Sequence, residues 1–217
     1  MQTLTEEVYK LAPPGGLFDE SVVRTLFSEL SYGAVKLLVH RAVKSGEVLR
    51  LKPGSFCLAP EFQRTHPHPF VVAAVLHSPS HISLESALWH HGLIPEALQI
   101  TSSVTWKRNR SFKTPLGLFT FQRVPALNPR AGVRATRLDE QGWGFIASPL
   151  RAIADLIYLK KDVRWEPGGL DFLTRSMRME EEDLRGISME DFHEVFETMK
   201  NQRVRTYLEW FRREAER

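Results

Sequence analysis

The stretch from Lys44 to Ala59, KSGEVLRLKPGSFCLA, decides how the N-terminal part of the chain folds. Gly46 follows a helical pattern and suits the left-handed residue that commonly ends a helix. Pro53-Gly54 fits the centre of a type II turn. Apolar residues on both sides of that turn predict two short strands: Val48, Leu49, Leu51, Phe56, Cys57 and Leu58. The stretch therefore predicts a helix that ends directly before a β-hairpin.

Three helical patterns precede this hairpin. The first covers Leu4 to Leu11 and stops at a Pro-Pro-Gly-Gly run, and the second begins at Asp19 or Ser21. Ser31 can cap the third, whose apolar stripe has helical spacing: Val35, Leu38, Val39, Ala42 and Val43. Helix, turn, helix and hairpin in this order predict a winged helix-turn-helix over residues 1–60.

The opposite face of the third helix, together with the hairpin, carries the candidate DNA-binding residues. Arg41 is the best candidate for reading a base edge, and Lys44 for contacting a phosphate. Leu37 can meet a thymine methyl group, or it can pack on a protein, so a protein-interaction module is the alternative. The full predicted set is Ser31, Tyr32, Lys36, Leu37, His40, Arg41, Lys44, Arg50 and Lys52.

Composition limits the class of protein. The chain has 217 residues, 42% of them apolar, and Cys57 is its single cysteine, which excludes an internal disulfide framework and a multi-thiolate zinc site. It begins with acidic residues where a signal peptide needs cations, and no apolar run is long enough to span a membrane. We therefore expect a cytoplasmic protein with no cofactor and no membrane partner.

Prolines between Pro60 and Pro69 indicate a linker, so residues 70–217 form the second part. A helix capped by Ser83 ends at Gly92, and a second helix begins at Ser148-Pro149. Strand patterns between these helices predict a small, mostly antiparallel sheet, at residues 99–105, 118–124, 132–137 and 143–147. Helices are also expected at 169–177, 188–200 and 202–213. The predicted fold class is α+β: a winged helix, a mixed C-terminal domain and a helical tail.

Charge is unevenly distributed along the second part. Residues 106–137 contain eight basic and no acidic residues, whereas residues 180–197 contain eight acidic residues and one arginine. Cations alternate with Trp106 and Phe112, which is typical of a single-stranded nucleic-acid platform or a second DNA contact. A solvated hairpin, or a surface facing the acidic segment, is the alternative. The candidate residues here are Lys107, Arg108, Arg110 and Lys113.

The sequence favours neither a metal site nor a magnesium-dependent catalytic site. His66 and His68, like His90 and His91, lack the spacing that puts two imidazoles on one helical face, so no metal site is predicted. A magnesium-dependent nuclease needs clustered carboxylates, often with a lysine two residues after a glutamate, and no Glu-x-Lys occurs. Glu85 and Asp155 lie in predicted helices and could meet, which leaves a nuclease as a minor alternative. We predict no catalytic residues and no enzyme activity.

Four segments in order resemble a known family. They are LVHRAVKSGEVLRLKPGSFCLAP (38–60), HISLESALWHHGLIPE (81–96), SVTWKRNRSFKTPLGLFTFQRV (103–124) and GFIASPLRAIADLIYL (144–159). Over about residues 20–160 the chain resembles the AbiEi antitoxins of type IV toxin-antitoxin systems and related bacterial transcription regulators. The tail after Lys161 lies outside this resemblance.

The resemblance implies a repressor that binds double-stranded DNA at inverted repeats in its own promoter, with a homodimer on the DNA. It also implies a C-terminal domain that antagonises a nucleotidyltransferase toxin without forming a stable complex. Of the family's site residues, only the cationic winged-helix surface carries over, onto Lys36, Arg41, Lys44, Arg50 and Lys52.

Overall fold

The N-terminal part is built from three short helices with side-chain caps. The computed structural model describes residues 3–95, 99–138, 142–165 and 169–215. Helices α1 (Leu4–Leu11), α2 (Glu20–Leu26) and α3 (Tyr32–Lys44) begin after Thr3, Asp19 and Ser31, whose side chains accept hydrogen bonds from backbone N–H groups of the first turn. Asp19, rather than Ser21, is therefore the cap of α2.

A three-stranded antiparallel sheet completes this part. Its strands are β1 (Leu17–Asp19), β2 (Val48–Lys52) and β3 (Ser55–Leu58), in the order β1-β3-β2. A 3₁₀ turn (Pro14–Gly16) precedes β1. Gly46 and Gly54 have φ angles of 82° and 76°, as the predicted helix end and hairpin turn require. Strand β1 was not predicted, because three residues carry too little periodicity.

The two parts are packed together across the hairpin. One buried apolar cluster lies within the N-terminal helices and sheet, and a second fills the rest of the chain. Leu51 and Cys57, from β2 and β3, belong to the second cluster. The predicted linker contains a 3₁₀ turn (Pro60–Phe62) and leads into α4 (Pro69–Leu76), which begins at a proline.

The second sheet has six strands and is mixed. They are β4 (His81–Ile82), β5 (Ile100–Thr105), β6 (Arg110–Thr114), β7 (Gly117–Arg123), β8 (Val133–Arg137) and β9 (Trp143–Ala147), in the order β6-β7-β5-β4-β9-β8. The pairs β5–β7 and β4–β9 are parallel. The prediction of a small, mostly antiparallel sheet needs this correction. Both parallel pairs join strands that do not follow one another in the chain, so no local pattern specifies them.

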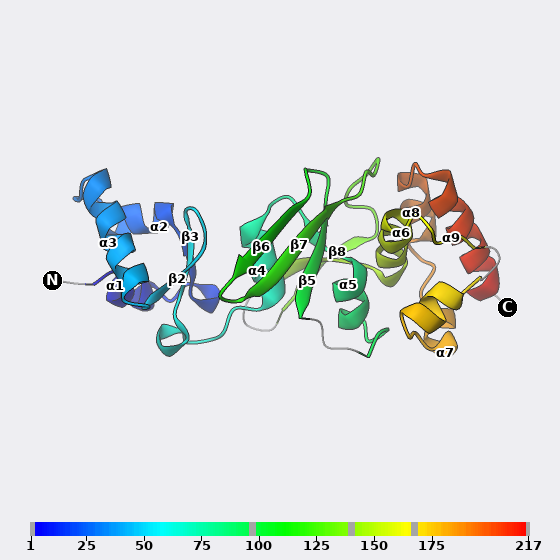
Figure 1. Cartoon of the computed structure of the whole chain (residues 1–217), viewed down its shortest axis with the longest axis horizontal. Helices are drawn as coiled ribbons and strands as arrows, with labels where there is room; N and C mark the ends of the chain where they lie inside the picture. Colours follow the sequence, from blue (N-terminus) through cyan, green and yellow to red (C-terminus); the bar gives the residue numbers. More distant parts are fainter. Residues whose placement is uncertain (1–2, 96–98, 139–141, 166–168, 216–217) are drawn as a thin grey trace.

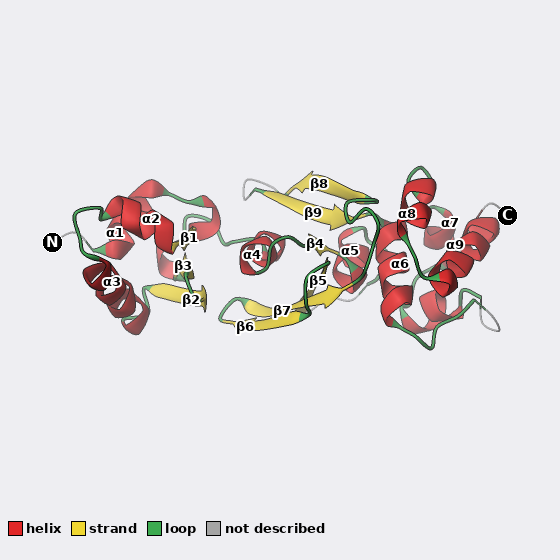
Figure 2. Cartoon of the chain, turned by 90° about the horizontal axis from the view of Figure 1, so that it is seen from above, coloured by secondary structure: helices red, strands yellow, loops and turns green. Residues whose placement is uncertain are grey.

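Helices lie on the concave side of the sheet and at one end. The sheet curves around α4 (Figure 2), and α5 (Leu84–His90) and α6 (Pro149–Leu159) lie between the sheet and the tail. The tail contains a π-helical turn η4 (Phe172–Ser176), α7 (Glu181–Arg185), α8 (Phe192–Thr198) and α9 (Gln202–Ala215). Figure 1 shows the N-terminal part and the tail at opposite ends, with the sheet between them.

Arg203 fastens the tail to α6. Its guanidinium donates hydrogen bonds to carbonyl oxygens at and just after the end of that helix: Ile157, Tyr158, Lys160 and Val163. Arg134 of the basic segment and Glu194 of the acidic segment form a salt bridge of 3.7 Å on the surface. Within the described ranges, no helix has the length and apolar character needed to cross a membrane.

Candidate nucleic-acid interface

Helix α3 presents the face that its periodicity predicts. Ser31 Oγ accepts a hydrogen bond from the Ala34 N–H at 3.3 Å and so fixes where the helix begins. Val35, Val39 and Ala42 are buried in the N-terminal core. The predicted DNA-facing residues of this helix are all exposed, namely Ser31, Tyr32, Lys36, Leu37, His40, Arg41 and Lys44. Tyr32 and Leu37 expose 55% and 48% of their surface, which is high for large apolar side chains.

A groove of about 450 Å³ separates α3 from the β2–β3 hairpin. Its helix side is lined by Tyr32, Val35, Lys36, Val39 and His40, and its other side by Glu20, Arg50, Pro53, Gly54 and Phe56. Arg50 therefore lies across the groove from Lys36. The structure brings these two predicted residues to one site although they are fourteen positions apart in the chain.

Aromatic rings hold the cations at this groove. The Lys36 ammonium lies 4.3 Å from the centre of the Tyr32 ring, and the Arg50 guanidinium lies 5.6 Å from that of Phe56. Contact with the Tyr32 hydroxyl also raises the pKa of Lys36, so this amine stays charged. Ring contacts position the cations and leave N–H groups for an anion, since an aromatic face accepts no conventional hydrogen bond.

The cations of this surface face solvent. Among the described residues, no carboxylate forms a salt bridge with Arg41, Lys44 or Arg50. Glu47, the acid next to the hairpin, instead accepts a hydrogen bond from Thr5 of α1 at 2.5 Å. Negative charge close to the cationic face is therefore limited, with Glu20 at the groove as the nearby acid.

The Lys52 ammonium forms hydrogen bonds within the fold. It donates to the carbonyl oxygens of Val75 (2.7 Å) and Leu76 (3.0 Å) at the end of α4, and burial lowers its pKa. The pairing of β2 with β3 shifts register between Arg50 and Lys52. Regular alternation would put Arg50 and Lys52 on the same face of the strand. The bulge between them interrupts this alternation, so their side chains point to different places.

Sequence reasoning missed Arg24. This exposed residue belongs to α2, and its guanidinium lies 6.0 Å from the centre of the Tyr32 ring. A cleft of about 690 Å³ lies beside it, between α2 and the start of α3. The periodicity of α3 could not identify Arg24, because its place depends on how α2 packs against α3.

The two aromatic side chains that alternate with the cations of the basic segment differ in exposure. Phe112 turns inward and packs edge-on against Phe121, with ring centres 5.8 Å apart, while Trp106 remains 43% exposed. Lys107 donates to the Ser78 carbonyl at 2.8 Å. Arg108, Arg110 and Lys113 are exposed, the last two on β6 at the edge of the sheet.

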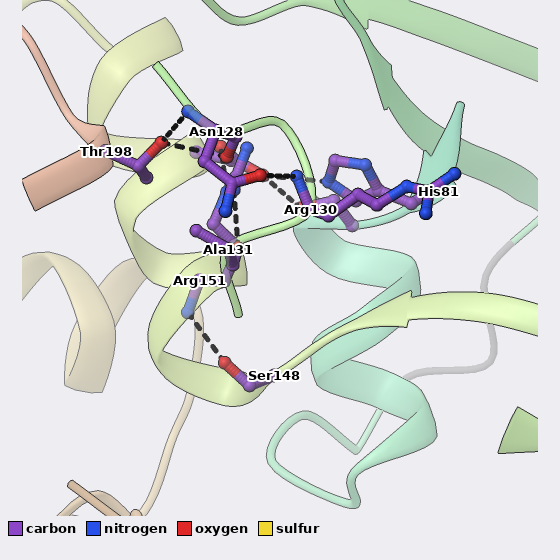
Figure 3. A network of polar contacts seen from close by, with 9 residues as sticks. His81, Asn128, Arg130, Ala131, Ser148, Arg151 and Thr198 are labelled. Carbon is purple, nitrogen blue, oxygen red and sulfur yellow. Dashed lines mark hydrogen bonds and ion pairs between the residues drawn. The ribbon is translucent and has the colours of Figure 1, made fainter. Parts of the chain in front are cut away.

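Asp155, a candidate for the nuclease alternative, lies in a buried polar network. Its carboxylate is fully buried and pairs with the Arg151 guanidinium at 3.0 Å, and Ser83 Oγ donates to it at 2.7 Å. Arg151 also donates to the Ala131 carbonyl (Figure 3). Burial alone would raise the pKa of Asp155, but Arg151, His81 and Ser83 together hold it below its usual range. This geometry makes Asp155 the partner of a buried cation rather than an accessible metal ligand.

The described residues contain no group of three or more His, Cys, Asp or Glu side chains placed to hold a metal ion. No family model matches the chain, and no curated protein matches it in sequence.

Proposed function

We propose that the chain is a DNA-binding transcription regulator whose first 60 residues form a winged helix-turn-helix. The supporting observation is the exposed cationic face shared by α3 and β2, with Lys36, Arg41 and Lys44 on the helix and Arg50 across the groove. A helix of this kind enters the major groove, while the hairpin follows the phosphate backbone.

The proposal gives different roles to the residues of this surface. Arg41 is the residue we assign to a base edge, where a bidentate guanidinium–guanine pair contributes about 1 to 3 kcal/mol of discrimination. Lys44, Arg50 and Arg24 contact phosphates, and Tyr32 and Ser31 donate from the start of α3. Leu37 meets a thymine methyl group. Lys52 is left out, because α4 holds its ammonium.

The resemblance to AbiEi antitoxins extends the proposal to a biological role. The chain would repress its own promoter by binding an inverted repeat as a homodimer in the cytoplasm. The C-terminal part would antagonise a nucleotidyltransferase toxin without a stable complex. These roles rest on the four similar segments.

The test is a titration of the chain's own upstream DNA by fluorescence anisotropy at two salt concentrations. Lys44→Ala should weaken binding to all duplexes and reduce the slope of log affinity against log salt by about 0.9, the value of one phosphate. Arg41→Ala should instead relax sequence preference at one base pair. Lys161→Ala is the matched control, since it removes one exposed cation that follows α6, a helix on the far side of the sheet from α3 (Figure 1).

The same samples separate the alternatives. Wild-type protein that fails to bind any duplex at low salt refutes the proposal and favours a protein partner for Leu37 and Tyr32, both of which are exposed. Magnesium-dependent cleavage of the DNA would instead support a nuclease.

A further inference from the structure

A second cationic surface lies next to the first. Figure 2 shows α3, β2 and β6 in a row along one long side of the chain, with β8 and β9 on the other side. Strand β6 is an edge strand of the large sheet and packs beside β2. Strand β6, the part of the basic segment at residues 110–114, is distant from α3 in sequence and continues the side of the chain that α3 and β2 begin.

Two lysines fix this arrangement at the end of α4. Lys52, from β2, donates to the carbonyls of Val75 and Leu76, and Lys107, from the loop before β6, donates to the carbonyl of Ser78. One short segment is thus held from both sides, by a residue of the hairpin and a residue of the basic segment. The relative position of the two surfaces is set by these contacts, by the buried Leu51 and by the partly buried Phe112, which both pack with the second core.

His77 belongs to the segment that these two lysines hold, since it lies between Leu76 and Ser78 in the chain. Its pKa is lowered first by burial and then by the charges of Lys107, Arg110 and Lys52. Three cations from two distant stretches of the chain therefore act on one imidazole. Cations from β2, from β6 and from the loop before β6 therefore gather at the junction between β2 and β6.

The edge strand β6 carries Arg110 and Lys113, which strand alternation directs to opposite faces, and the loop before it carries Arg108. Arg108, Arg110 and Lys113 are exposed, and no described carboxylate forms a salt bridge with them. We propose that this edge is a second phosphate-binding surface, which contacts the flanking backbone of the same duplex that α3 reads. The inference rests on the proposed function, and it implies that the protein contacts a longer stretch of the duplex.

Duplex DNA fits this surface better than a single strand does. Single-strand platforms stack successive bases on exposed rings, but Phe112 is partly buried with its ring against Phe121, whereas Trp106 is exposed. Regularly spaced phosphates need only cations at a fixed distance, which a rigid strand edge supplies.

The expected size of the effect follows from counterion release. Three phosphate contacts contribute about 2.7 to the slope of log affinity against log salt, at about 0.9 each. Between about 50 and 200 mM salt, that slope corresponds to a loss of affinity of about 40-fold. Removing the three cations should therefore make binding correspondingly less sensitive to salt.

The experiment uses the whole chain and two duplexes that contain the bound site. One duplex is trimmed to about 12 base pairs around the α3 contact, and the other extends the flanks to about 26 base pairs, at 3.4 Å per pair. The triple variant R108Q/R110Q/K113Q is compared with K160Q/K161Q/R164Q, which removes the same charge from exposed residues near the tail. Thermal midpoints check that both variants fold. If the triple variant does not fold, the single variant R110Q replaces it in the comparison.

On the long duplex, we expect the β6 variant to bind more weakly than wild type and with a smaller slope of log affinity against log salt. On the short duplex, the β6 variant should match wild type. The tail variant should match wild type on both duplexes. Equal slopes for wild type and the β6 variant on the long duplex would overturn the inference. If Lys44→Ala still weakens both duplexes in that case, the proposed function stands without the second surface. Wild type that binds neither duplex would remove the proposed function itself.

Discussion

Replacing Asp155 by alanine tests the energetic account of the C-terminal part. Arg151 is fully buried and donates to Asp155 Oδ1 and to the Ala131 carbonyl. Without the carboxylate, the guanidinium keeps its charge in a site that water does not reach, which costs about 3 to 5 kcal/mol. Ser83 also loses its acceptor, which adds about 1 kcal/mol. A total near 5 kcal/mol is a large share of the 5 to 15 kcal/mol typical of a folded domain.

The assay is equilibrium unfolding in urea near neutral pH, followed by circular dichroism. Asp155→Ala should shift the midpoint strongly, whereas R151M/D155L should lie much nearer to wild type because it removes both charges together. Glu181→Ala breaks an exposed pair with Arg185 of the same i,i+4 type, so it should have little effect and serves as the control. A loss below about 1 kcal/mol for Asp155→Ala would refute the claim that Arg151 depends on this partner.

Three further predictions follow from individual side chains. Burial lowers the pKa of three histidines (His77, His81 and His90) below the usual 6.5, so the unfolded chain binds protons more readily and stability should fall as the pH drops through that value. The urea midpoint measured from about pH 7.5 to 5.5 should show this, with a shallower dependence in His81→Gln. Lys52→Met should lower the thermal midpoint by removing the hydrogen bonds to α4 and leave the salt dependence of DNA binding unchanged; an altered slope would return Lys52 to the phosphate contacts. Burial raises the pKa of Cys57 to about 11, so a thiol reagent near pH 8 should modify it only on unfolding, and rapid modification of the native chain would contradict its buried place.

The parts of the fold that the sequence predicted are those with local causes. Ser31 caps α3, the stripe through Val35 and Val39 sets its buried face, and Gly54 allows the hairpin turn. Each signal lies within a few residues of the structure it specifies. The exposed face of α3 followed directly from the helical repeat, so its candidate residues were placed correctly on the surface.

The parts that the sequence missed depend on distant partners. Strand β4 has two residues and exists through its pairing with β5 on one side and β9 on the other. Strand β6 has Phe112 as its one large apolar residue, so its composition resembles a loop until β7 pairs with it. The adjacency of β6 to the hairpin is likewise a property of the packed chain, and periodicity within 106–137 contains no information about it.

Lys52 shows how such a distant partner changes a functional assignment. Alternation along β2 would direct Arg50 and Lys52 to the same side, and their charge made both candidates for phosphate contacts. The bulge between them separates the two side chains, so that Arg50 stays at the groove while Lys52 reaches the end of α4. Because the Lys52 ammonium bonds the end of α4, it holds the hairpin against the C-terminal part. The position of Arg50 relative to α3 is therefore set partly by residues beyond the linker, and any partner that displaces α4 would move the hairpin relative to the groove that it borders.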